Sequence, residues 1–441
     1  MDTLIRILQL LLALSIIVLA HELGHFLFAR LFKIKVDKFY LFFDPWISLV
    51  KFKSKKSETE YGIGWLPLGG YCKISGMIDE SMDKEALKEE PKPHEFRSRP
   101  AWQRFLVMFG GVLFNFILAI LLHSAILFTW GESYLKNDDA VYGVQCNDLA
   151  QEIGFRNGDR ILRLDGNTID GFSELQVILV RERVKRVELL RDGEIIYLDI
   201  DPDYIGQMLN SAGMFMLRYP FQIAMIPDSS HNLHLGLMPG DRIVGIDSVE
   251  VFITQDIQQI LQEKRGEVVT AAILREGSII QKELKVDNEG KIGIILEAPS
   301  SEFFNMTIHR YSLPKSIPAG FNRTTSTIGD YVKDLKLIFS PKTEAYKSVG
   351  SLIAIGKIFP SAWSWIRFWN IIAWLSIMLA VLNLLPIPAL DGGHILFILF
   401  EMVSGRKPSD KFMEYAQVTG MIILFCIMFL ALGNDIVKLF K

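Results

Sequence analysis

The residues best suited to chemistry in this chain lie in one pentapeptide, His21-Glu22-Leu23-Gly24-His25. On a helix, positions i and i+4 share a face, so His21 and His25 can bind the same metal ion. Glu22 lies beside them and is a candidate general base for a metal-bound water. This pattern is typical of zinc proteases. The alternative is a chance match on a buried helix.

The pentapeptide continues an apolar run from Leu10 to Ala20. Ionisable side chains in a membrane-type helix are costly and are retained mainly where they have a function. The position of the pentapeptide therefore favours a metal site over a chance match. The run has no basic region beyond Arg6 and no small-residue cleavage site, so we interpret it as a membrane span and not as a signal peptide.

A third ligand is predicted near the other end of the chain, in the segment from Asn383 to His394. Two prolines and two glycines break a helix there, and irregular backbone at membrane depth is tolerated where it lines a cavity. Asp391 lies in the break and can supply a carboxylate oxygen, which leaves a fourth metal position for water. The alternative is a kinked span with an aspartate at the membrane interface.

The composition predicts a mixture of membrane spans and a water-soluble portion. Of 441 residues, 50% are hydrophobic and 22% are charged. Four stretches are apolar and long enough to span a bilayer, at about 4–28, 105–130, 363–385 and 418–432, with a shorter apolar stretch at 395–403. The net charge of -3 argues against a nucleic-acid partner. Three distant cysteines imply neither a disulfide framework nor a metal site.

Basic residues orient these spans through the positive-inside rule. They gather after the first span, before the second and before the last, at Arg30, Lys33, Lys35, Lys38, Lys51, Lys53, Lys55, Lys56, Lys92, Arg97, Arg99, Arg104, Arg406, Lys407 and Lys411. We expect this side to be cytoplasmic, with both termini on one side and His21 and His25 near the cytoplasmic end of their span. The acid-rich segment 131–300 is expected on the opposite side.

That segment contains an internal repeat, because residues 154–169 recur as residues 236–251. Each copy predicts a Gly-Asp turn, a short apolar strand, a tight turn and another strand. The pair resembles tandem PDZ domains of the permuted bacterial form, with Asp247-Ser248 where the pattern has Asp-Gly. Whether the PDZ grooves bind peptides or serve only as spacers stays open. Residues 328–339 predict an amphipathic helix, either at a membrane surface or packed on the soluble domains.

Taken together, the two motifs and the PDZ pair between them resemble the site-2 protease family, and within it the branch of sigma-E regulator proteases. The resemblance implies zinc bound by His21, His25 and Asp391, with Glu22 as the catalytic base. It implies substrate binding by Asn383, by Asn115 of the motif that begins at Gly111, and by Gly69 and Gly70. Residues 62–74 match a membrane-associated β-hairpin region of the family, and residues 348–351 depart from the Gly-Pro that relatives often carry.

The expected fold is therefore a multi-pass α-helical membrane protein with about four transmembrane helices, a membrane-associated β-hairpin region and two extracytoplasmic α+β PDZ domains. We expect a membrane core at 1–130 and 363–441, PDZ domains at 131–205 and 206–300, and an amphipathic linker at 301–362. Within residues 62–74 we expect an edge strand that pairs with an unwound substrate. The alternative is a plain interfacial hairpin that only anchors the loop.

The expected function is intramembrane zinc proteolysis of single-span proteins in the bacterial cytoplasmic membrane. By resemblance, the substrates would be an anti-sigma factor already trimmed outside the membrane, or remnant signal peptides. One alternative is a non-catalytic membrane adaptor with peptide-binding PDZ domains, but Glu22 and all three ligand residues are intact. A second alternative, an ion transporter, is disfavoured because no inverted hydropathy repeat is visible.

Overall fold

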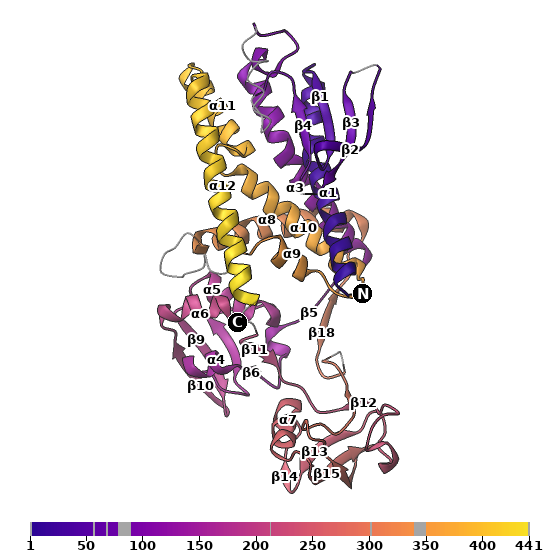
Figure 1. The fold of residues 1–441 in the computed structure, drawn as a ribbon. Helices are drawn as coiled ribbons and strands as arrows, with labels where there is room; N and C mark the ends of the chain where they lie inside the picture. Colours follow the sequence, from indigo (N-terminus) through magenta and orange to yellow (C-terminus); the bar gives the residue numbers. More distant parts are fainter. Residues whose placement is uncertain are drawn as a thin grey trace. The chain divides into compact units, whose positions relative to one another are not determined.

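The computed structural model describes residues 2–55, 58–67, 69–77, 90–211, 213–299, 302–338 and 350–439. The chain forms two compact units (Figure 1), one from the described parts of 2–131, 310–338 and 350–439, the other from those of 132–309. Leu68 and the departure at 348–349 lie outside the described residues.

The first unit is a helical bundle with one sheet. Its helices are α1 (Asp2–Leu31), α3 (Ala101–Thr129), α8 (Leu313–Ile338), α9 (Leu352–Ile358), α10 (Trp365–Leu384), α11 (Asp391–Ser404) and α12 (Asp410–Leu439), with a 3₁₀ turn at Phe96–Ser98. Among the described residues, four helices are long and apolar enough to cross a membrane, namely α1, α3, α10 and α12. This agrees with the predicted number of spans, and α11 corresponds to the shorter apolar stretch.

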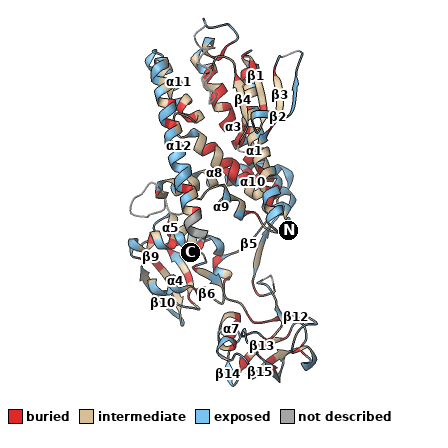
Figure 2. Ribbon diagram, in the orientation of Figure 1, coloured by how far each residue is buried: buried red, intermediate tan, exposed pale blue. Residues whose placement is uncertain are grey.

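The helix α3 lies at the centre of the bundle and packs against α1, α8, α10 and α11. Buried residues concentrate on α3 and α10, whereas α12 is exposed along much of its length (Figure 2). The backbones of α1 and α3 touch at two glycines, because a Cβ added to Gly24 would lie 2.2 Å from the carbonyl oxygen of Gly110. Small residues of this kind let membrane helices approach closely.

The amphipathic helix predicted at 328–339 is α8, which begins earlier, at Leu313. It packs against α3 and α10. Neither of the two predicted positions, at a membrane surface or packed on the soluble domains, describes this packing fully. Gly320 of α8 abuts Ser124, and Nδ1 of His123 lies 2.9 Å from the hydroxyl oxygen of Thr324. Small and polar residues therefore join α8 to the second predicted span.

The sheet of this unit differs from the predicted hairpin. Its strands are β1 (Val36–Leu41), β2 (Phe43–Lys53), β3 (Glu60–Leu66) and β4 (Tyr71–Ile74), in the order β2-β3-β1-β4. The prediction of a hairpin within residues 62–74 is wrong, because β3 and β4 lie on either side of β1 and do not pair with each other. Val36 and Tyr40 of β1 are buried. This agrees with the position of β1 inside the sheet, where one of its edges pairs with β3 and the other with β4. The predicted edge strand is present as β4.

The second unit carries the repeat. Its strands are β5 (Glu132–Leu135), β6 (Val144–Cys146), β7 (Arg160–Leu164), β8 (Asn167–Thr168), β9 (Arg186–Arg191), β10 (Glu194–Asp199), β11 (Phe215–Leu217), β12 (Ile223–Met225), β13 (Arg242–Ile246), β14 (Val249–Glu250), β15 (Val268–Arg275), β16 (Ser278–Lys285), β17 (Ile295–Leu296) and β18 (Met306–His309). Its α-helices are α4 (Asp148–Ile153), α5 (Leu175–Arg181), α6 (Ile205–Asn210) and α7 (Thr254–Glu263). The sheets β10-β9-β7-β8 and β16-β15-β13-β14 have the same order, which confirms the internal repeat.

Side chains reproduce the repeat as well. The buried Asp159 accepts two hydrogen bonds from Arg191, which also donates to the carbonyl of Gly154. In the second copy, Asp241 and Arg275 form the same arrangement with Gly236. The tight turn after the strand is also kept, because Ser248 has a φ of 72° where the first copy has Gly166 with a φ of 81°. The departure at Ser248 therefore leaves the turn intact.

Candidate metal centre

Two ligands come from α1, where helical spacing puts both imidazoles on the face toward α3. His21 and His25 are only 7% and 6% exposed, and their Nε2 atoms lie 3.2 Å apart. Nδ1 of His25 lies 2.8 Å from the carbonyl oxygen of Val107 on α3. When Nδ1 donates to this carbonyl, the Nε2 lone pair is left available to a metal, as in zinc sites whose histidines donate to a backbone carbonyl.

The third ligand comes from the break after α10. The chain leaves α10 at Leu384 and makes two tight turns, in which Ile387 donates to the carbonyl of Leu385 and Leu390 to that of Ile387. Asp391 then begins α11, with its Oδ2 atom 3.2 Å from Nε2 of His21 and 3.4 Å from Nε2 of His25. The next residue must be small, because a Cβ on Gly392 would lie 2.1 Å from the oxygen of Leu385.

The three atoms have the spacing of a zinc site. Ligand atoms about 2.0–2.1 Å from a tetrahedral zinc ion lie roughly 3.3–3.4 Å from one another. The observed separations of 3.2, 3.2 and 3.4 Å match this value. Oδ2 of Asp391 is buried and has no hydrogen-bond partner within the described part of the chain. A buried carboxylate oxygen without a donor, facing two imidazole nitrogens, fits a cation bound between them.

Two asparagines touch the same histidine. Asn115 is fully buried on α3, with its side-chain amide 3.3 Å from Nδ1 of His21. The atom placed there is the amide nitrogen, and the amide oxygen has no partner among the described residues. Nδ1 must carry the proton if Nε2 binds a metal, so a half-turn of the Asn115 amide, which exchanges its oxygen and nitrogen, gives this proton an acceptor and the oxygen a partner. Asn383, at the end of α10, has its amide 3.4 Å from Nε2 of His21 and is only partly buried.

Glu22 and β4 lie side by side. The Glu22 carboxylate lies close to the backbone amide of Cys72 on β4, and a Cβ added to Gly70 would lie 3.6 Å from Cγ of Glu22. Gly70, just before β4, is held between β1 and α1, because a Cβ there would lie 2.7 Å from both the oxygen of Tyr40 and a methyl of Val18. Gly69 has a φ of 153° and packs against Phe43. The substrate-binding roles of Gly69, Gly70, Asn115 and Asn383 stay predictions.

The structure thus brings together His21, His25, Asp391, Glu22, Asn115 and Asn383, residues that are far apart in the sequence. It also shows contacts that sequence analysis did not identify. These are the carbonyl of Val107, the amide of Cys72, and Gly111, whose added Cβ would lie 2.4 Å from Nε2 of His25. Gly111 begins the motif that contains Asn115, but only the structure shows why a glycine is needed there, which is to leave space for the two imidazoles. The Val107 and Cys72 groups belong to the backbone and have no sequence signal.

The arrangement offers two imidazole nitrogens, one carboxylate oxygen and a second carboxylate beside them. This is the set of groups that metal-assisted hydrolysis requires, with three protein ligands, one open position and a base.

Comparison with known proteins agrees with this chemistry. Residues 9–427 match peptidase family M50. A protein of Borreliella burgdorferi is 30% identical over 432 residues, covering 96% of each chain. Proteins of Xylella fastidiosa and Thermotoga maritima are each 27% identical, covering 99% and 97% of this chain and 99% of their own. All three are named "Putative zinc metalloprotease". A match over almost the whole length makes this chain a member of peptidase family M50, the site-2 protease family, with zinc as its cofactor.

Proposed function

We propose that the protein is an intramembrane endopeptidase that cuts single-span membrane proteins. The observation that supports this most directly is that His21 and His25 lie on a helix apolar enough to span a membrane. Asp391 meets them from the break that follows another such helix, α10. A soluble protease has no need to place three ionisable ligands among apolar spans.

The chemistry follows from the positions of the groups. Zinc supplies Lewis acidity, which acidifies a bound water and polarises a carbonyl. Glu22 takes the proton of the attacking water and delivers it to the leaving amine. The Asn383 amide, beside His21 at the end of α10, is placed to donate to the backbone of a peptide lying across the site. Asn115 and the Val107 carbonyl hold the two imidazoles in the tautomer that binds metal.

Replacement of Glu22 tests this function. Glu22→Gln should lower cleavage of a single-span test substrate by about 10²–10⁴-fold while zinc stays bound, because the glutamate is not a ligand. Asp391→Ala should lower both zinc content and cleavage. Wild-type cleavage by Glu22→Gln would remove Glu22 as the base. Absence of cleavage by the zinc-loaded wild-type protein would favour the alternative, a non-catalytic adaptor that uses its PDZ domains to bind peptides.

The edge strand β4 suggests how a helical substrate is presented. A peptide bond within a transmembrane helix is screened by its own hydrogen bonds, and unpaired groups in lipid cost several kcal/mol each. One edge of β4 pairs with β1, and no other described strand pairs with it. The Cys72 amide of β4 lies next to Glu22. An unwound substrate that adds to β4 would therefore be held beside the catalytic base.

The proposed location is the bacterial cytoplasmic membrane, with the catalytic site near the cytoplasmic side. The two repeats would be PDZ domains on the periplasmic side that act as a filter against untrimmed substrates. A reporter fused near Asn210 should behave as periplasmic, and a cytoplasmic signal would reverse this orientation. Deletion of about 131–300 should let untrimmed substrates be cut. If only trimmed substrates are cut after the deletion, the filter is not in this segment.

The proposed substrates are an anti-sigma factor already trimmed outside the membrane and remnant signal peptides, in the manner of the sigma-E regulator proteases. A direct assay compares a full-length and a trimmed single-span protein as substrates of the purified enzyme. Faster cleavage of the trimmed form is the expected result, and equal rates would contradict a requirement for trimming.

A further inference from the structure

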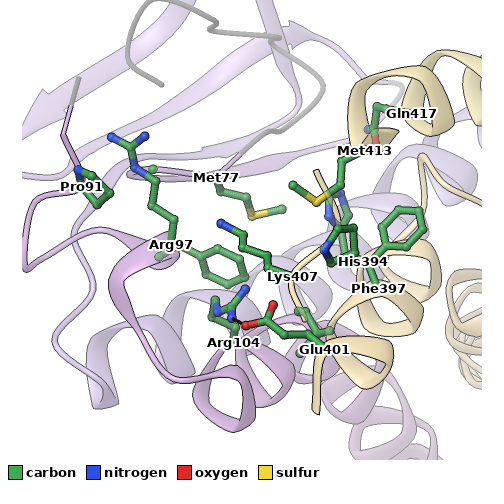
Figure 3. A pocket seen from close by; sticks show the side chains of 14 residues that line it. Met77, Pro91, Arg97, Arg104, His394, Phe397, Glu401, Lys407, Met413 and Gln417 are labelled. Carbon is green, nitrogen blue, oxygen red and sulfur yellow. Dashed lines mark hydrogen bonds and ion pairs between the residues drawn. The ribbon is translucent and has the colours of Figure 1, made fainter. Parts of the chain in front are cut away.

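A cavity of about 180 Å³ lies at one end of the helical bundle, and none of the three zinc ligands lines it. It is formed by described residues between β4 and α3, by the start of α3, by α11, by the loop after α11 and by the start of α12 (Figure 3). This is the end where the predicted basic flanks of the spans gather, and Arg99 there donates to the carbonyl of Lys33 at the end of α1. We call this space the basic cavity.

Three cations line the basic cavity, and each has a different environment. Arg97 is paired with Glu95 at 2.6 Å, and Arg104 with Glu401 at 2.5 Å. Glu401 is the only carboxylate of the described lining. Lys407 has no hydrogen bond or carboxylate partner among the described residues, and in Figure 3 its side chain reaches between Met77 and Arg104. Among the described lining residues, the exposed Lys407 is thus the cation without a carboxylate partner, and its side chain points into the space.

A buried amide adds a second polar group without a partner. Gln417 on α12 is only 5% exposed and lines the same space. Its side chain makes no hydrogen bond to another described residue, and its polar atoms are not among the fully buried ones. They are therefore open to the cavity, where a ligand or water can be their partner.

The remaining walls are apolar, and they are made by Met77, Phe96, Phe397, Ile398 and Met413. A cation and an amide set among apolar walls, between the ends of membrane helices, match the headgroup region of an anionic lipid. A soluble metabolite would not need the apolar walls at a membrane surface. The site therefore combines the chemistry for a phosphate group with that for the carbon chain attached to it.

We propose that the basic cavity binds the phosphate group of an anionic phospholipid, with Lys407 and Gln417 as its ligands and the apolar walls against the lipid's glycerol and acyl carbons. His394 of the lining lies one turn after Asp391 on α11, and Gly420 lies one turn after Gln417 on α12. A Cβ on Gly420 would lie 2.6 Å from the backbone of Pro388, in the loop that carries Asp391. A lipid bound here would hold together the two helices that support the third zinc ligand.

The test is binding of phosphatidylglycerol to the full-length protein, measured by native mass spectrometry after reconstitution in phosphatidylcholine nanodiscs with graded phosphatidylglycerol. Two variants address the ligands, Lys407→Gln and Gln417→Leu. Arg406→Gln is the matched control, because Arg406 is an exposed basic neighbour outside the cavity lining. Helix content measured by circular dichroism serves as the folding measure for each variant. Inorganic phosphate is added in a parallel arm.

Wild-type protein should retain phosphatidylglycerol in preference to phosphatidylcholine, Lys407→Gln should weaken retention roughly tenfold, and Arg406→Gln should behave as wild type. Gln417→Leu should weaken retention in the same direction. Displacement of the lipid by inorganic phosphate, dependent on Lys407, would support the phosphate site and identify free phosphate as a second source. Equal retention by wild type, Lys407→Gln and Gln417→Leu, or equal retention of phosphatidylcholine, would overturn the proposal. None of these outcomes depends on proteolysis.

Discussion

The Cβ atom that any other residue would carry at Gly111 falls 2.4 Å from Nε2 of His25, the imidazole nitrogen that faces Asp391. The same atom would lie 2.6 Å from Cε1 of His21. At Gly111, the helix α3 therefore forms a wall of the metal centre with its backbone. A glycine is needed here for space, because the ligand atoms occupy the volume of a side chain.

Gly111→Ala should accordingly lower zinc affinity at least about tenfold, since the added methyl group displaces a ligand nitrogen itself and not only a group that orients a ligand. The measurement is zinc content by elemental analysis after dialysis against a graded chelator. Gly433→Ala is the matched control, because a Cβ at Gly433 on α12 meets nothing within 4 Å. Unchanged zinc affinity in Gly111→Ala would show that the ligands move aside at little cost.

Asn115 should act on zinc through His21. Asn115→Leu should weaken zinc binding by about 10–100-fold, as expected when the group that orients a metal-binding imidazole is removed. Asn115→Asp should recover most of the loss, because a carboxylate also accepts from Nδ1–H. If Asn115→Leu keeps normal zinc affinity but raises KM, Asn115 contacts substrate instead, as the family resemblance implies.

Much of the metal centre could be predicted from sequence because its first half is local. Helical periodicity alone puts His21 and His25 on one face, and the structure has them 3.2 Å apart. Asp391 lies several hundred residues away, and its approach depends on packing between α1, α3 and α11. What the sequence shows for it is the helix break, whose prolines and glycines allow the carboxylate to turn inward.

The sheet could not be predicted to the same extent, because strand order depends on partners distant in the chain. Residues 62–74 have the short apolar runs and turn residues of a hairpin, yet β3 and β4 pair with β1 instead. The local pattern of residues indicates that a segment forms a strand, but it does not indicate which other strand that segment pairs with. For the basic cavity the sequence shows only the basic flanks of the spans, because Lys407 and Gln417 line one space through the way the chain folds between α11 and α12.

The second repeat should lose stability in acid through Asp241. Burial raises the pKa of this carboxyl, but the hydrogen bonds and charge of Arg275 and the amide of Met238 lower it by more, so the net pKa lies below its ordinary value. A group with a lowered pKa in the folded state stabilises above its unfolded value of about 3.9 and loses that contribution as the pH falls. Protection of the β13 and β15 amides from hydrogen exchange should therefore fall below about pH 4.

Replacement of Asp241 distinguishes the loss of the Asp241–Arg275 pair in acid from the protonation of other carboxylates. Asp241 is 1% exposed, so Asp241→Asn should cost about 3 kcal/mol at pH 7 and leave a flatter pH profile. Asp228→Asn, which changes an exposed carboxylate in the same repeat, should keep the wild-type profile. A variant at Asp241 with an unchanged acid transition would assign that transition to other groups.

The last prediction concerns β4 as the strand that receives substrate. Cys72→Pro removes the backbone N–H that lies next to Glu22, while Cys72→Ala keeps it and serves as the matched control. Proline should slow cleavage at least about tenfold in a zinc-loaded protein, since β4 then lacks a donor N–H beside Glu22 that water cannot replace in the membrane.

The kinetic constants then separate two roles of that N–H. Loss of strand pairing raises KM, and helix-breaking residues in the substrate span should speed cleavage by lowering the cost of unwinding. Loss of a hydrogen bond that only orients Glu22 lowers kcat with KM unchanged, because the base is then misplaced for every substrate. If proline at Cys72 and at the other positions from Gly69 to Ile74 leaves both constants at the alanine control's values, β4 does not pair with substrate. The sheet would then only anchor the segment between α1 and α3 at the membrane surface.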